Sequence, residues 1–334
     1  MAKRSGRKVE VVSLRSETSD VFATPEGELE AREYLRPVRT RINGAWQSID
    51  TDLAKAESGT VAPKATTVGL AFSGGGDGPL VRMERAGRTL ELAWPEPLPA
   101  PVLNGDTATY PDVLPDVDLR LAARPEGFTQ LLVVKSAQAA KSEELAELRL
   151  QLGGEGMSVR ETVNGGLEAV DKGAGGVVFE APTPMMWDSS PGEQGDAPTT
   201  RRAAAPGVED DATGEPGEPG AGESGRLAPV GVDVASGGEE LVLTPDRDLL
   251  TGPETVYPVF IDPQWDTPRA SAWTMASKYW AGSPQWKFNG DADGGLGYCG
   301  WVYCPALRRQ AALLPDIDHQ VRRAVDSVGR VRGP

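Results

Sequence analysis

The sequence predicts a mainly β protein, built around an antiparallel β-sandwich-like domain with one short helix. The 334 residues include 40 glycines and 28 prolines, which is typical of many short strands joined by tight turns. From Val9 to Trp187, apolar or alternating runs follow one another between turn residues. Hydrophobic residues make up only 39% of the chain, which indicates that a segment without a core is also present.

Tight turns place the first strands. Asn43-Gly44, within PVRTRINGAWQSID, suits a type I′ hairpin, and Pro25-Glu26-Gly27 predicts a second hairpin upstream. The glycine-rich SGGGDG at Ser73–Gly78 lacks the Lys-Ser/Thr ending of a phosphate loop, and Pro79 follows it, so a hairpin turn is favoured. Further strands are predicted at TVGLAFS, LVRMERAGRTLELAW, VDLRLAARPEGFTQLLVV and VFEA.

One segment, SAQAAKSEELAELRLQL, has the apolar spacing of a helix. An amphipathic helix turns its apolar side to the core and its charged side to solvent. The positions expected to face inward are Ala139, Leu145 and Leu148, and those expected to face outward are Glu143, Glu144 and Glu147.

Residues 189–226 differ in kind from the rest of the chain. They contain eight glycines, five prolines and eight carboxylates, and Val208 is their only large aliphatic residue. Such a composition cannot bury enough apolar surface to offset the entropy of ordering, so it predicts a long disordered acidic linker. Strand patterns resume at Leu227 with LAPVGVDV, EELVLTPD and TVYPVFIDP, and pairing back onto the first domain is favoured over a new domain.

These patterns divide the chain into six predicted parts. An aromatic-rich stretch after the last of these strands is interpreted as the incomplete start of a second β module. The parts are a disordered basic start (1–8), a β-rich domain (9–188), the linker (189–226), strands completing the domain (227–264), the aromatic-rich segment (265–304) and a non-native tail (305–334).

Charge and residue counts exclude several classes of protein. The net charge of -15 argues against binding to nucleic acid or to an anionic membrane surface. No run approaches eighteen apolar residues, so membrane insertion is not expected. The single histidine, His319, removes the usual residues of Ser-His-Asp, Cys-His and multi-histidine metal sites. The chain is therefore expected not to be an enzyme.

Five of the eight tryptophans fall between positions 265 and 301. Aromatic faces suit the apolar surfaces of sugar rings, although such residues more often fill the core between two sheets. The ligand-binding candidates are Trp273, Trp280, Trp286 and Trp301.

GDTATYPDVLPDVDL brings four carboxylates together in sequence, and glycoside hydrolysis uses two across a cleft. Asp116 and Asp118 are two apart, which places them on one side of a strand. Because prolines occupy positions 111 and 115, an extended edge loop capped by aspartate is favoured. The carboxylates are Asp106, Asp112, Asp116 and Asp118.

Two motifs near the end concern metals and cysteines. NGDADGG indicates a loose calcium site at Asp291 and Asp293, although the glutamate of an EF-hand is absent; no other cofactor is predicted. Cys299 and Cys304 are too far apart in sequence for a zinc or thioredoxin motif. They form either a disulfide within the loop or a pair with a cysteine elsewhere.

A family resemblance rests on VEVVSLRSETSDVFATPEG, LRPVRTRINGAWQSIDTDL, FSGGGDGPLV, GDTATYPDVLPDVDLRL, PMMWDSS and YPVFIDPQW. These strings resemble the N-terminal portion of large secreted streptomycete proteins described as LamG-like jellyroll or DNRLRE-containing, over residues 8–304. The resemblance implies a secreted or cell-surface location, although MAKRSGRKVEVV is not a signal peptide. It also implies a non-catalytic scaffold for adhesive or carbohydrate-binding modules, with polysaccharide or cell-wall components as partners.

After Tyr303 the composition changes abruptly. PALRRQAALLPDIDHQVRRAVDSVGRVRGP has six arginines, no lysine and no aromatic residue, as a GC-rich gene gives when translated out of frame. A one-base shift permits a strand-like translation instead, so residues 305–334 are predicted to be a frameshift product of a longer protein. Two alternative functions remain open: the leader of an RHS/YD-repeat or polymorphic-toxin-like protein, and a hydrolase using Asp112 and Asp116.

Overall fold

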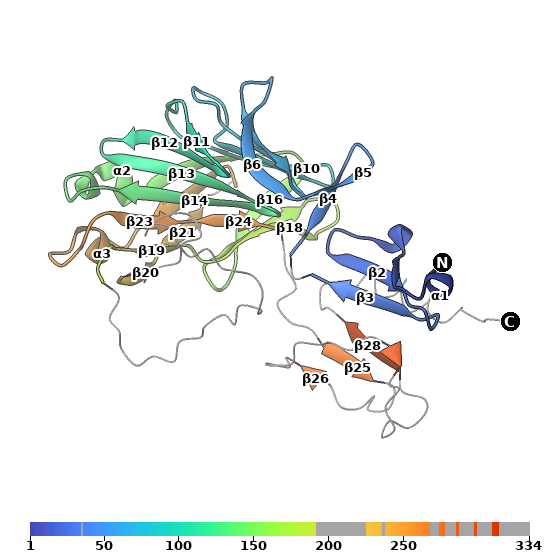
Figure 1. The fold of residues 1–334 in the computed structure, drawn as a ribbon. Helices are drawn as coiled ribbons and strands as arrows, with labels where there is room; N and C mark the ends of the chain where they lie inside the picture. The colour runs from blue at the N-terminus through green and yellow to red at the C-terminus, as the bar shows by residue number, and fades with distance from the viewer. Residues whose placement is uncertain are drawn as a thin grey trace. The chain divides into compact units, whose positions relative to one another are not determined.

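The computed structural model describes residues 1–34, 36–191, 225–235 and 238–267, and beyond these only the backbone of four short strands. The chain divides into two compact units, one of residues 1–35 and 269–334 and one of residues 36–268. Figure 1 shows both as mainly strands, so the predicted mainly β class is confirmed. The predicted boundaries differ, since residues 9–35 lie outside the larger unit and Trp265 lies inside it.

The smaller unit begins with a three-stranded antiparallel sheet in the order β1-β2-β3. Residues 2–5 form a one-turn helix that Gly6 ends in a left-handed conformation, so the predicted disorder of residues 1–8 is wrong for this turn. The predicted hairpin at Pro25–Gly27 is confirmed, with Gly27 at φ 95°. The elements are α1 Ala2–Ser5, β1 Val9–Glu10, a 3-10 turn Val12–Leu14, β2 Ser19–Ala23 and β3 Leu29–Glu33.

Four further strands of this unit pair in the order β26-β25-β28-β27. They are β25 Thr274–Ser277, β26 Gln285–Trp286, β27 Gly297–Tyr298 and β28 Arg309–Leu313. The last of them falls within the predicted frameshift tail, and it pairs with β25 from Thr274↔Leu313 to Ser277↔Gln310.

The larger unit holds two antiparallel sheets and a two-stranded hairpin, β4 (Arg39–Ile42) and β5 (Ala45–Ser48). Asn43 and Gly44 both have positive φ, 51° and 80°, as the predicted type I′ turn requires. The first sheet has the order β21-β22-β15-β10-β9-β8-β7-β6. Its strands are β6 Asp50–Lys55, β7 Val61–Ala65, β8 Gly69–Phe72, β9 Val81–Arg85, β10 Arg88–Ala93, β15 Leu148–Gly153, β21 Gly231–Val234 and β22 Glu240–Thr244.

The second sheet has eleven strands, with the main order β11-β12-β13-β14-β24-β18-β17-β16. It branches at β14, whose C-terminal half pairs with β23 and whose N-terminal half pairs with β24. The strands are β11 Val102–Asn104, β12 Thr107–Leu114, β13 Val117–Arg124, β14 Gly127–Val134, β16 Met157–Glu161, β17 Leu167–Asp171, β18 Val177–Ala181, β19 Met185–Trp187, β20 Leu227–Pro229, β23 Val259–Asp262 and β24 Gln264–Asp266.

The apolar core belongs to both sheets. Alternating residues of β13, Leu119 and Leu121, join alternating residues of β15, Leu150 and Leu152, in one cluster of buried side chains. Phe72 of the first sheet meets Phe128 of the second edge to face, with ring centroids 6.1 Å apart. The unit is therefore sandwich-like, with its core between the sheets.

Both edges of the first sheet are engaged. At one edge the Leu53 N–H of β6 donates to the Gly105 carbonyl, beside the β11–β12 turn, at 2.8 Å. At the other edge the Val234 N–H of β21 donates to Glu161 Oε1 of β16 at 2.8 Å. These contacts occupy backbone donors that an open edge would offer to another chain.

The predicted helix at residues 136–152 is mostly wrong. Only a 3-10 turn, Ala139–Lys141, and one helical turn, α2 (Glu143–Ala146), form there. From Leu148 the chain alternates buried and exposed residues as strand β15, because LRLQLG has period two and pairs with β10 and β22. The expected burial is confirmed, since the three apolar positions are buried and the three glutamates are exposed. A further short helix, α3 (Arg247–Thr251), begins at Asp246, whose side chain accepts from the Leu249 N–H.

The predicted edge loop around Pro111 is instead strand β12, the second strand of its sheet. Its register shifts between Tyr110 and Leu114, and this bulge includes Pro111, which has no N–H to donate to the ladder. Tyr110 is fully buried and donates its hydroxyl hydrogen to the Ser73 carbonyl at 2.7 Å, and burial raises its pKa well above the usual range.

The predicted linker, 189–226, connects two strands that pair with each other. Residues 192–224 lie outside the described residues. On either side of them, Trp187 of β19 pairs with Leu227 of β20, and β19 also pairs with β23. The chain thus leaves and re-enters the same sheet at neighbouring positions.

Truncating Phe128 tests the shared core. Phe128→Ala is expected to lower the free energy of unfolding by about 3–5 kcal/mol, because it leaves a cavity between the two sheets. Denaturant unfolding followed by circular dichroism measures this change. Val163→Ala, at a fully exposed hairpin tip, is the control and is expected to leave stability unchanged. A loss below about 1 kcal/mol for Phe128→Ala would contradict the shared core.

Replacing residues 192–224 by a four-residue Gly-Ser linker tests whether the sandwich depends on them. Because β19 and β20 pair directly, shortening the connection is expected to keep the fold and to raise the free energy of unfolding by up to about 2 kcal/mol. The same unfolding experiment measures it. A loss of more than about 2 kcal/mol would show that the replaced residues stabilise the sandwich by packing.

Candidate functional site

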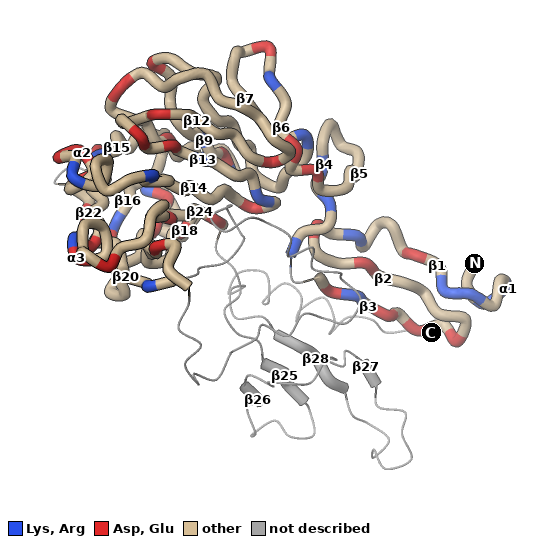
Figure 2. Tube along the Cα trace, turned by 60° about the vertical axis from the view of Figure 1, so that its left-hand side comes forward, with Lys and Arg blue, Asp and Glu red and all other residues tan. Residues whose placement is uncertain are grey.

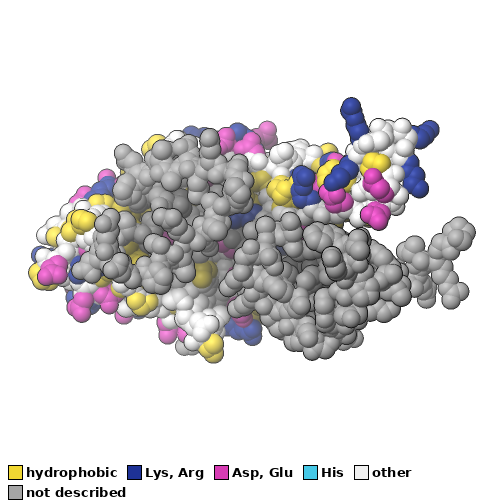
Figure 3. Space-filling view, turned by 60° about the horizontal axis from the view of Figure 1, so that its bottom comes forward, with side chains coloured by type: hydrophobic (Ala, Val, Ile, Leu, Met, Phe, Trp, Pro, Cys, Tyr) yellow, Lys and Arg dark blue, Asp and Glu magenta, His cyan; other side chains and the backbone are white. Residues whose placement is uncertain are grey.

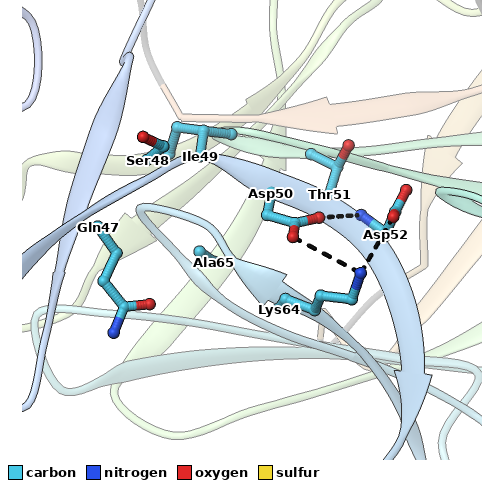
Figure 4. Close-up of a pocket in the computed structure, with 8 residues that line it drawn as sticks. All are labelled: Gln47, Ser48, Ile49, Asp50, Thr51, Asp52, Lys64 and Ala65. Atoms are coloured by element: carbon cyan, nitrogen blue, oxygen red, sulfur yellow. Dashed lines mark hydrogen bonds and ion pairs between the residues drawn. The ribbon is translucent and has the colours of Figure 1, made fainter.

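An open hollow of about 630 Å³ lies where β5 runs into β6, beside β7. Figure 4 shows Gln47 and Asp52 on opposite sides of it, with Ala65 between them. Polar side chains form most of the wall, and Ile49 and Ala65 are its apolar members. The lining residues are Gln47, Ser48, Ile49, Asp50, Thr51, Asp52, Lys64 and Ala65.

A β-bulge shapes this hollow. Asp50 pairs with Ala65 and Leu53 with Pro63, so β6 carries one extra residue over this interval. The Asp52 N–H donates to Asp50 Oδ1 at 3.1 Å, which stabilises the local turn. A bulge re-aims side chains, and here both carboxylates reach the same lysine.

Lys64 of β7 connects the two carboxylates. Its Nζ lies 3.0 Å from Asp52 Oδ2 and 3.6 Å from Asp50 Oδ2. The hydrogen bond to Asp52, followed by the charge of Asp50, raises the pKa of Lys64 above its usual value. The side chains of Lys64, Asp50 and Asp52 are 50%, 44% and 59% exposed. Pairs this exposed contribute little to stability, so the fold does not depend on them.

The predicted aspartate cluster is only partly assembled. Lys135 Nζ lies 2.6 Å from Asp118 Oδ1 and 3.1 Å from Asp112 Oδ1, so one ammonium neutralises both carboxylates. Asp116 occupies the β12–β13 turn at φ 64°, and its carbonyl accepts from the Lys135 N–H. Asp106 lies at the other end of β12, where its side chain accepts from Thr107. Lys135 therefore holds Asp112 together with Asp118, and it contacts Asp116 through the backbone carbonyl of that residue.

A further carboxylate, Asp188, is completely buried at the base of the 192–224 connection. It accepts hydrogen bonds from the backbone N–H groups of Ser190, Arg226 and Val256, and Arg226 Nη2 lies 3.1 Å from Oδ2. Burial acts to raise the pKa of Asp188, but the hydrogen bond from the Ser190 hydroxyl and those from the three backbone N–H groups outweigh it and lower the pKa to about 2. Asp188 thereby joins the two ends of the connection to the segment before β23.

Several predicted site residues lie outside the described side chains. These are the calcium candidates, the four tryptophan candidates, the two cysteines and His319: Asp291, Asp293, Trp273, Trp280, Trp286, Trp301, Cys299, Cys304 and His319. Trp265, the first of the aromatic cluster, is buried in the sandwich core. Among the described residues, no group of three or more acidic, histidine or cysteine side chains is placed to hold a metal ion.

Charges of both signs are mixed over the described surface. Figure 2 shows acidic and basic positions interspersed along the strands of the larger unit, and Figure 3 shows the same mixture on another face. Opposite charges also pair across strands, as Arg160 does with Glu168 and Arg88 with Asp171. In the part of the chain that the structure describes, no helix has the length and apolar character needed to cross a membrane.

Comparison with protein-family models, with curated proteins and with solved structures gave no significant match. The hollow and the Asp188 network were not found by sequence reasoning. The bulge in β6 depends on pairing with β7, and the Asp188 network joins residues that are far apart in the chain. The only local signal was the polar run QSIDTD, in which Ile49 is the one apolar residue.

The Asp188 network gives stability a defined pH dependence. Because the folded pKa is about 2 and the usual value is 3.8, its contribution is present above pH 3.8 and is lost as the pH falls toward 2. The shift corresponds to about 2 kcal/mol. Asp188→Asn is therefore expected to be less stable near neutral pH, with the difference from wild type narrowing between about pH 4 and pH 2.

Thermal unfolding of both proteins across this pH range measures the difference. Asp233→Asn, an exposed position on β21, is the matched control and is expected to follow the wild-type curve. A constant difference between wild type and Asp188→Asn at all pH values would show that the charge of Asp188 contributes nothing.

Proposed function

We propose that this chain is a non-catalytic β-sandwich scaffold of a secreted or cell-surface multidomain protein. The observation that carries the proposal is that carboxylates of the larger unit bind neighbouring cations and backbone N–H groups of the same chain. Asp118 and Asp188 are held by cations and backbone donors between or beside strands, where they stabilise turns and connections. A catalytic acid and base need an open space between them for a substrate bond.

The engaged sheet edges also support a scaffold. The backbone contact of Leu53 with Gly105 and the side-chain contact of Glu161 with Val234 protect the first sheet from pairing with other chains. A module joined to others in one polypeptide benefits from such edges, because high local concentration favours edge-to-edge aggregation. The location and the partners, polysaccharide or cell-wall components, follow from the sequence resemblance alone.

The competing function is hydrolysis by paired aspartates. It uses Asp112 and Asp116, and Lys135 would have to leave Asp112 before that carboxylate could act on a glycosidic bond.

Incubation with insoluble polysaccharides separates the two functions. The chain is expected to release no soluble reducing sugar from cellulose, chitin or isolated cell wall above the buffer level. Asp112→Asn and Asp116→Asn are expected to give the same result as the wild type. Release by the wild type that either substitution abolishes would overturn the scaffold proposal and favour the hydrolase.

A further inference from the structure

We infer that the open hollow between β5, β6 and β7 binds an uncharged, hydroxyl-rich ligand, an oligosaccharide segment, through Gln47, Asp52 and the hydroxyls around them. The inference rests on the proposed function for its partner, a polysaccharide, and gives that partner a site; the non-catalytic scaffold role does not depend on it. The volume of the hollow, about 630 Å³, falls within the range of small-molecule sites, about 300–1,000 Å³.

The first argument is the position of Asp50, Asp52 and Lys64, whose ion pairs add little to stability. β6 departs from regular pairing so that Asp50 and Asp52 both approach Lys64. The three charges gain little from this, because all remain about half exposed. This bulge in the edge strand β6 brings three charged groups together on an accessible surface, and bulges are common both at sheet edges and next to active sites.

The second argument is the free hydrogen-bonding capacity. Among the described residues, the side chains of Gln47, Ser48 and Thr51 form no hydrogen bond, and Figure 4 shows none between them and the other lining residues. An amide and two hydroxyls each donate and accept, and the carboxylates accept in addition. Sugar hydroxyls also donate and accept, so this set matches them.

Charge and polarity exclude the other ligand classes. Two carboxylates and one ammonium leave the hollow with a net negative charge, which disfavours an anionic ligand. A cationic ligand or metal ion would compete with Lys64, which already holds both carboxylates. A lipophilic ligand would meet only Ile49 and Ala65 as apolar wall. A neutral polyol requires none of these groups to move.

Titration of the full ¹⁵N-labelled chain with glucose hexamers tests the inference. Cellohexaose, laminarihexaose and maltohexaose are the neutral probes, and a galacturonate hexamer and a chitosan hexamer are the charged comparators. At least one neutral hexamer is expected to bind with a Kd on the order of 1 mM, as suits a solvent-open site. It is expected to shift the NMR signals of the Gln47 side-chain amide and of the Thr51 and Asp52 N–H groups.

Two substitutions localise the binding. Asp52→Asn is expected to weaken it about tenfold, because a charged acceptor is lost. Gln47→Ala breaks no ion pair and is expected to weaken it about threefold. Both positions are exposed, so unchanged melting temperatures are expected. The matched controls are Gln151→Ala and Asp233→Asn, exposed positions of β15 and β21 in the same sheet, and both are expected to bind as the wild type does.

Three results would overturn the inference. They are the absence of shifts with every neutral hexamer at about 10 mM, preferential binding of a charged hexamer, and binding that Asp52→Asn and Gln47→Ala leave unchanged. None of these results concerns the release of sugar, so the scaffold proposal would still stand on its own test.

Discussion

Strand β14 is the constraint on which the larger unit depends. Every residue from Gly127 to Val134 is buried, so the strand is covered on both faces. It pairs with β13 along its whole length, and its two halves pair separately with β23 and β24. A side chain at Gly127 would place its Cβ 2.0 Å from the Trp265 carbonyl oxygen, so the close approach of β24 requires glycine there. The sheet forks because this one strand accepts two partners.

The fork explains why the chain must return to the sandwich after residue 224. Without β23 and β24, both halves of β14 would present unpaired backbone groups in a buried position. Trp265 then fills the core between the sheets. The completely buried Asp188 accepts hydrogen bonds at the point where the connection begins and ends, and it thereby links β19, β20 and the segment before β23. The sandwich is thus closed by residues that are distant in sequence.

Sequence patterns predicted the parts of this fold that depend on local physics. Asn43-Gly44 suits a turn with positive φ, and strand patterns predicted the segments that form β9, β10, β13 and β14. The helix prediction failed after Ala146 because apolar spacing over a few residues fits both a helix and a strand, and pairing with β10 and β22 decides. Partner choice, bulges and the Asp188 network arise only from such long-range pairing, which no local pattern encodes.

Exposure separates the roles of the three clusters in which a cation meets carboxylates. The Asp188 side chain is 0% exposed, so removing its partners would leave a buried charge, and the network is structural. Asp118 is 16% exposed, and Lys135 ties it to a strained turn at Asp112 and Asp116. Asp52 is 59% exposed, and water competes with Lys64 for its oxygens. A contribution to stability therefore explains the arrangement around Asp188, explains that around Asp118 only in part, and hardly explains that around Asp52. The arrangement of the third cluster is best explained by a ligand that replaces the competing water.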